Sequence, residues 1–304
     1  MEPNPLLILG VCGPELTTDT AELIRSLQPG GFVLGSGNLI DIAQTRRLND
    51  QLRALSEIEP FLFFRSDQEG VWPPRLLEAP APTPDQLREQ GDPKRIMTAA
   101  WIAGRLLRLL GFNAHLSPAF TIGGGWGNDD QEVINNSGTF NRFQRKQGIL
   151  TCGCSFPGGN SCADLDTAAL LRSPLLPYTA LMPELDGILL SNAVFPKLDP
   201  LSPASTSNQI ITRLLRDQLG YNRLVLAETN DPVAISAGAD LIIGTDVERA
   251  PETLAALGEL SGYTLSDAVD RIEYAKKRLH KPTKLTPKTL DRLQEDAHNL
   301  VSES

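Results

Sequence analysis

The sequence lacks the features that mark membrane, secreted or nucleic-acid-binding proteins. No apolar run approaches the roughly 20 residues that a membrane-spanning helix needs, so we expect no membrane partner. Residues 1–5 contain no basic region and lead into no long apolar core, so no signal peptide is predicted. Basic residues are outnumbered by acidic ones, 28 to 37, and the net charge of -9 argues against a nucleic-acid partner.

Cysteine is also scarce. Four cysteines in 304 residues, without a secretion signal, predict reduced thiols and a cytoplasmic protein. Cys152 and Cys154 are closer together than usual zinc ligands and have no His nearby, so buried thiols are favoured over a metal site that would add Cys12 and Cys162. A thiol nucleophile at Cys154 and a disulfide to Cys162 stay open, although no group that would lower the thiol pKa is evident. No metal or other cofactor is predicted.

Apolar runs and amphipathic stretches alternate along the chain. The runs predict eight buried parallel strands, at residues 6–12, 32–34, 60–65, 112–120, 149–155, 187–192, 224–228 and 240–244. This pattern predicts an α/β fold, a single (β/α)8 TIM-type barrel over residues 1–280, followed by a polar tail of low order at residues 281–304. An open doubly wound sheet is less consistent, because no Gly-rich phosphate motif follows the first strand. Only residues 229–239 separate the last two strands, so the barrel is expected to be imperfect there.

Acidic residues follow two of these strands. Asp67 comes after the third strand and Glu228 ends the seventh. Barrel folds build their sites at the carboxyl ends of the strands, so we expect both carboxylates to point at a common pocket. A solvated strand end is the alternative for Asp67. Trp72 and Trp126 flank the predicted mouth and either stack on a ligand ring or pack within their loops.

Several motifs resemble glycoside hydrolase family 3, most closely its bacterial single-domain β-N-acetylglucosaminidases. They are Ser66-Asp67-Gln68-Glu69-Gly70, residues 109–121, Ser155-Phe156-Pro157-Gly158-Gly159, residues 195–215 and residues 220–228. The resemblance implies that residues 1–280 form the family's N-terminal-type barrel. It also implies a retaining hydrolysis of terminal β-linked amino sugars, through a covalent sugar–enzyme intermediate.

The resemblance also assigns catalytic positions. The family's nucleophile, an Asp, corresponds to Glu228, whose extra methylene moves the oxygen by about an ångström, a shift that can cost on the order of 100-fold in rate. The family's acid/base, a His on the loop after strand five, corresponds to Gly159, which transfers no proton. Asp164 and Asp166 are candidates for a substitute acid, although capping of the following helix is favoured for them.

The sugar-contacting positions have changed in the same way. Asp67 is retained, whereas the family's Lys-His pair is Cys154-Ser155 here and its His at the end of strand six is Asn192. His115 is expected to be a partnered core residue. We therefore predict a family 3-like protein of β-N-acetylhexosaminidase type that binds a small sugar or sugar-like ligand with weak or lost turnover. The alternative is a catalytically dead barrel that acts as a small-molecule-binding or protein-interaction scaffold.

Overall fold

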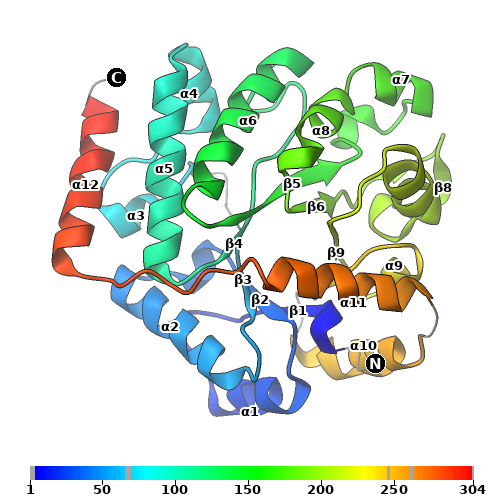
Figure 1. Cartoon of the computed structure of the whole chain (residues 1–304), viewed down its shortest axis with the longest axis horizontal. Coiled ribbons are helices and arrows are strands. Elements are labelled where there is room, and N and C mark those ends of the chain that lie inside the picture. Colours follow the sequence, from blue (N-terminus) through cyan, green and yellow to red (C-terminus); the bar gives the residue numbers. More distant parts are fainter. Residues whose placement is uncertain (1–3, 66–69, 245–246, 261–262, 303–304) are drawn as a thin grey trace.

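The eight predicted strands close into a parallel barrel in the computed structural model, which describes residues 4–65, 70–244, 247–260 and 263–302 (Figure 1). They are β1 Leu7–Gly10, β2 Gly31–Leu34, β3 Phe61–Arg65, β4 Ala114–Leu116, β5 Leu150–Phe156, β6 Gly187–Leu190, β9 Leu224–Glu228 and β10 Leu241–Gly244. Around the barrel the order is β1-β2-β3-β4-β5-β6-β9-β10, and β10 pairs with β1 to close it. The predicted (β/α)8 fold is confirmed. Strands β7 Val194–Phe195 and β8 Asp199–Pro203 form a separate antiparallel hairpin.

Helices surround the barrel (Figure 1). They are α1 Thr18–Leu27, α2 Ile42–Leu55, α3 Pro74–Leu77, α4 Pro84–Glu89, α5 Pro93–Leu110, α6 Asp130–Arg145, α7 Thr167–Arg172, α8 Leu176–Leu181, the π-type helix Gln209–Gln218, α9 Val233–Ser236, α10 Ala250–Gly258, α11 Tyr263–Lys276 and α12 Pro287–Ser302. Several of these helices begin at a residue whose side chain caps the first turn. In α2, for example, the Asp41 carboxylate accepts a 2.7 Å hydrogen bond from the Gln44 N–H. None of the helices in the described part of the chain is long and apolar enough to cross a membrane.

The strands could be predicted from the sequence because both of their faces are buried, which makes each strand a continuous apolar run. In β3, Phe61, Leu62, Phe63 and Phe64 are at most 2% exposed, so the residues of this strand are apolar without alternation. Burying each such side chain stabilises the fold by about 1.5–3 kcal/mol relative to its exposed state. Arg65 is the first residue of the strand to reach solvent, and it lies at the end where the loops begin.

The unit between β9 and β10 is shortened, as predicted. Its helix, α9, has only four residues, which is a single turn. The barrel still closes here, because β10 pairs in register with β9 on one side and with β1 on the other. The missing helix length therefore thins the outer layer of the barrel without opening the sheet.

The prediction of a tail of low order is wrong for residues 287–302, which form α12. This helix lies beside α5 (Figure 1). Leu293, Ala297 and Leu300 are buried at the i, i+4, i+7 spacing of an amphipathic helix, which a mainly polar composition concealed. The Arg95 guanidinium donates a hydrogen bond to the Leu300 carbonyl, and Arg108 donates one of 2.8 Å to the His280 carbonyl in the connecting segment.

Candidate functional site

A cavity of 560 Å³ opens where the strands end. Arg65 of β3, Leu116 of β4, Cys154 of β5 and Glu228 of β9 line it, and three of these four close their strands. The cavity therefore occupies the carboxyl end of the barrel, which is the end that barrel enzymes use for their sites. Its position is the one predicted from the strand ends.

An ion pair between Arg65 and Glu228 crosses this cavity. The guanidinium Nη1 donates a 2.7 Å hydrogen bond to Oε1, and Nη2 lies 2.6 Å from Oε2 in an ion-pair contact without hydrogen-bond geometry. Three strands separate β3 from β9 in either direction around the barrel, so the pair joins opposite sides of the mouth. Both side chains remain about a third exposed, 33% for Arg65 and 28% for Glu228. Arg65 was not predicted as a site residue, because its only signal in the sequence is a charge at the end of an apolar run.

Cys154 lies beside this pair as a protonated thiol. Burial raises its pKa to about 12, although the nearby Arg65 guanidinium acts in the opposite direction. Its Sγ donates to the Cys152 carbonyl at 3.4 Å. Cys12, Cys152, Cys154 and Cys162 are all free of disulfides. In the described part of the chain, no three His, Cys, Asp or Glu side chains are grouped closely enough to hold a metal ion. A thiolate nucleophile is therefore disfavoured.

His115 lines the same cavity from β4. Its Nδ1 lies 2.9 Å from Gln144 Oε1, its ring lies 5.3 Å from that of Phe64, and it is buried, so the prediction of a partnered core residue is confirmed. Burial lowers its pKa to about 4, so the imidazole is neutral near pH 7. Because Gln144 Oε1 can only accept, Nδ1 carries the proton and Nε2, which has no partner among the described residues, presents a lone pair.

The two predicted mouth tryptophans differ. Trp126 lines the cavity and packs on Phe140, with ring centroids 4.8 Å apart. Trp72 is 2% exposed and does not line the cavity, so its loop-packing role is the one observed. Ser155, whose backbone φ is 74°, and the exposed Asn192 also lie outside the cavity lining. Asp67 lies outside the described residues, and its contact with a sugar stays a prediction.

The two candidates for a substitute acid lie away from the cavity lining. Asp166 accepts a 2.8 Å hydrogen bond from the Ala169 N–H and caps α7, and Asp164 is exposed. Besides Glu228, the described carboxylate that lines the cavity is Asp85, in the first turn of α4 and 3.2 Å from Arg88. Asp85 was not predicted as a site residue, because it follows a Pro-rich segment that is typical of a loop. The end of this segment instead forms a capping box at Thr83.

Comparisons with known proteins agree with this geometry. The profile described as "Glycosyl hydrolase family 3 N terminal domain" matches residues 6–281. A "Beta-hexosaminidase" of Pseudomonas aeruginosa (strain LESB58) is 24% identical over 272 residues, which cover 82% of this chain and 79% of the relative. A "Beta-hexosaminidase" of Vibrio cholerae serotype O1 (strain M66-2) is 27% identical over 278 residues, with the same coverage, 82% and 79%.

Solved structures share the fold. A glycoside hydrolase family 3 β-N-acetylglucosaminidase from Paenibacillus sp. str. FPU-7 superposes with a TM-score of 0.81 at 24% identity, covering 97% of this chain and 67% of the other. Native NagZ from Neisseria gonorrhoeae has a TM-score of 0.78 at 17% identity, with 98% of both chains covered. The family profile spans nearly the whole barrel, and the chain therefore belongs to glycosyl hydrolase family 3, with relatives of the β-hexosaminidase type.

Proposed function

We propose that this barrel binds a small sugar or sugar-like ligand, of the β-linked amino-sugar class on which β-hexosaminidases act, with weak or lost hydrolysis. The cavity at the strand ends offers both a carboxylate and a guanidinium in one neutral pair. Sugar hydroxyls donate to the first and accept from the second, so a neutral, hydroxyl-rich ligand suits this pair better than an ion of either sign. Trp126 adds an apolar wall of the kind that sugar rings contact.

The Arg65–Glu228 pair is the observation that carries the loss of turnover. A retaining glycosidase needs a free carboxylate oxygen to attack the sugar. Here Glu228 Oε1 accepts a 2.7 Å hydrogen bond from Arg65, and Oε2 lies 2.6 Å from the same guanidinium. Hydrogen bonds between charged groups contribute about 1.5–3 kcal/mol each, less where solvent screens them, as it does for Arg65. A cost of about 1 kcal/mol to open a pair this exposed slows attack about fivefold.

Poor proton delivery to the leaving group is the second reason to expect weak or lost hydrolysis. By the resemblance to family 3, Gly159 stands where the family has its acid/base. A Cβ added there would lie 3.2 Å from Thr121 Cγ2, so a side chain at this position requires Thr121 to shift. The described titratable groups around the cavity suit the task poorly. Cys154 has a pKa of about 12, His115 has one of about 4, and Asp85 is paired with Arg88.

The scaffold alternative predicts a mouth filled by side chains. A cavity of 560 Å³ that keeps polar groups on its wall instead favours occupation by a small molecule. We therefore retain ligand binding as the proposed function and use the scaffold as the outcome that contradicts it.

The experiment combines binding with turnover. Thermal unfolding is recorded with N-acetylglucosamine and with muropeptide fragments, because a ligand at 100 times its Kd stabilises the native state by about 2.7 kcal/mol. In parallel, 4-nitrophenyl N-acetyl-β-glucosaminide is used as a substrate whose leaving group needs no acid. The variants are Glu228→Gln and Arg65→Ala, with Arg213→Ala as a matched control, since Arg213 is 69% exposed on a remote helix.

We expect ligand-dependent stabilisation of the wild type that is lost in both cavity variants and kept in the control. Release of nitrophenol is expected to be absent, or slow and abolished by Glu228→Gln. Efficient wild-type cleavage of an unactivated chitobiose that Glu228→Gln abolishes would contradict the loss of turnover. No stabilisation by any of these sugars would contradict ligand binding and leave the scaffold.

A further inference from the structure

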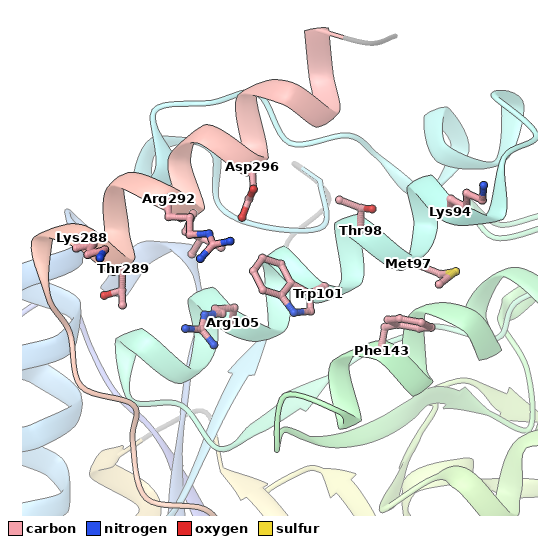
Figure 2. Close-up of a pocket in the computed structure, with 11 residues that line it drawn as sticks. Lys94, Met97, Thr98, Trp101, Arg105, Phe143, Lys288, Thr289, Arg292 and Asp296 are labelled. Carbon is pink, nitrogen blue, oxygen red and sulfur yellow. The ribbon is translucent and has the colours of Figure 1, made fainter.

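A second cavity, remote from the barrel mouth, lies between α5 and α12. Its volume is 720 Å³, and none of its lining residues belongs to the cavity at the strand ends. Figure 2 shows Trp101 of α5 directed into the space between the two helices. Met97 of α5 and Phe143 of α6 also line it, and these three apolar side chains are only partly buried. The groove therefore leaves an apolar floor within reach of solvent.

Positive charge surrounds this floor. Lys94 and Arg105 on α5 and Lys288 and Arg292 on α12 line the groove, against one acid, Asp296. Among the described residues, none of these four cations has a carboxylate within ion-pair distance, and Arg105 instead lies 5.7 Å from the centre of the Trp101 ring. The protein as a whole carries a net charge of -9, so this concentration of cations opposes the overall sign. Unpaired charge of one sign around an apolar floor is complementary to an acidic partner.

One wall of the groove lies outside the family barrel. The family profile ends at residue 281, whereas α12 spans Pro287–Ser302. The buried Leu293 and Leu300 and the hydrogen bond from Arg95 to the Leu300 carbonyl attach this helix to the barrel. The exposed Lys288 and Arg292 make no contribution to that attachment, so their positions at the groove are not explained by folding.

We propose that the groove between α5 and α12 docks an acidic segment of a partner protein, with an aromatic or aliphatic side chain inserted against Trp101. Lys94 and Arg105 are 11 residues apart on α5, which places them about 16 Å apart along the helix axis. An extended segment of about five residues spans that distance, whereas a single small anion contacts only one end of it. A membrane surface does not enter a hollow. A nucleic acid carries phosphates along its whole length and would meet the negatively charged surface beyond the four cations, whereas a short acidic segment stays within the groove.

The test begins with a displayed library of random peptides selected against the full chain. The peptide enriched most is then synthesised with a fluorescent label, and its affinity is measured by anisotropy. The groove variant is Lys288→Glu/Arg292→Glu, and the matched control is Arg172→Glu/Lys197→Glu, which reverses two exposed cations away from α12. Trp101→Ala tests the apolar floor. Circular dichroism and thermal unfolding verify that each variant is folded.

We expect a consensus of acidic residues flanking one apolar residue. Its affinity should fall by about tenfold or more in the groove variant and in Trp101→Ala, remain within about twofold in the control, and weaken with added salt. Glu228→Gln should bind the peptide normally, which separates this site from the sugar cavity. A consensus without acids, equal losses in groove variant and control, or preferential binding of phosphatidylserine vesicles or single-stranded DNA to the groove would overturn the proposal.

Discussion

Arginine–carboxylate clusters lie at both ends of this barrel, and they differ in burial and in number of partners. At the amino ends of the strands, Asp240 is fully buried, with Arg216 at 2.7 Å, Arg271 at 2.8 Å and the Val225 N–H at 2.7 Å. At the carboxyl ends, Glu228 is 28% exposed, and Arg65 is its one partner among the residues that the structure describes.

Asp186 repeats the buried pattern. Its carboxylate is 2% exposed, lies 3.1 Å from Arg145 and 2.5 Å from Arg278, and accepts from the Thr151 N–H at the start of β5. The carboxylates at the amino ends thus bind strand backbone as well as arginine, and they fix neighbouring strands to the surrounding helices. Glu228 faces a cavity and accepts no backbone hydrogen bond from the described residues, so this end of the barrel retains a polar group that a ligand can contact.

The largest expected effect is at Asp240. Asp240→Asn keeps the shape of the side chain but leaves Arg216 and Arg271 without their counter-charge in a buried position. Breaking a buried pair in this way costs about 3–5 kcal/mol, which urea unfolding followed by circular dichroism measures. The control is Asp217→Asn, since Asp217 is 57% exposed and 3.7 Å from Arg213, and it is expected to cost less than about 0.5 kcal/mol. Equal losses in the two variants would mean that burial adds nothing to the Asp240 cluster beyond what an exposed pair contributes.

The sequence predicted most of what is local and buried. The eight strands were identified because parallel strands with two buried faces are uninterrupted apolar runs, as in Phe61–Arg65. The sequence also favoured Asp166 as the cap of the following helix, and its carboxylate accepts a hydrogen bond from the N–H of Ala169, three residues further along α7. Helix α12 was not predicted because only three of its 16 residues, Leu293, Ala297 and Leu300, are buried, which leaves the composition of the segment mainly polar.

The site was only partly predictable, because its central contact is long-range. Arg65 and Glu228 are 163 positions apart, and only closure of the barrel brings their side chains together. Glu228 was placed correctly from the strand end, whereas Arg65 carried no motif. Asp85 reaches the cavity from a helix that follows a Pro-rich segment, and no local pattern points it there. From the sequence, Trp72 and Trp126 also had the same two alternatives, ligand stacking or loop packing. Only the structure shows that Trp126 lines the cavity and that Trp72 is buried away from it.

The second-largest effect is expected at His115. This side chain is buried like the carboxylates at the amino ends of the strands, but it lines the cavity at the carboxyl ends. Burial lowers its pKa from 6.5 to about 4. Between these values the unfolded chain binds the proton and the folded chain does not, so stability falls as the pH drops from 6.5 towards 4. At about pH 5 the loss from this group is about 2 kcal/mol relative to neutral pH.

Urea unfolding of wild type and His115→Gln at neutral pH and at about pH 5 measures this term. The wild type should lose about 2 kcal/mol more than the variant over this interval. His298→Gln serves as the control, because His298 is exposed on α12 and its removal should leave the pH dependence unchanged. If the wild type and His115→Gln lost the same free energy of unfolding over this pH interval, the imidazole would be hydrated through the cavity. The barrel mouth would then not be buried as the amino ends of the strands are.

The smallest expected effect on stability is at the mouth itself. Because Arg65 and Glu228 are each about a third exposed, water solvates whichever partner remains after Arg65→Ala or Glu228→Gln, and each change should cost at most about 1 kcal/mol. A double-mutant cycle in urea should give a coupling energy of the same size or less. Ligand-dependent stabilisation should nevertheless disappear in both variants, so that the pair matters for binding and little for folding. A coupling energy near the 3–5 kcal/mol of a buried pair would instead make the Arg65–Glu228 contact a strut across the mouth, equivalent to the clusters at the amino ends.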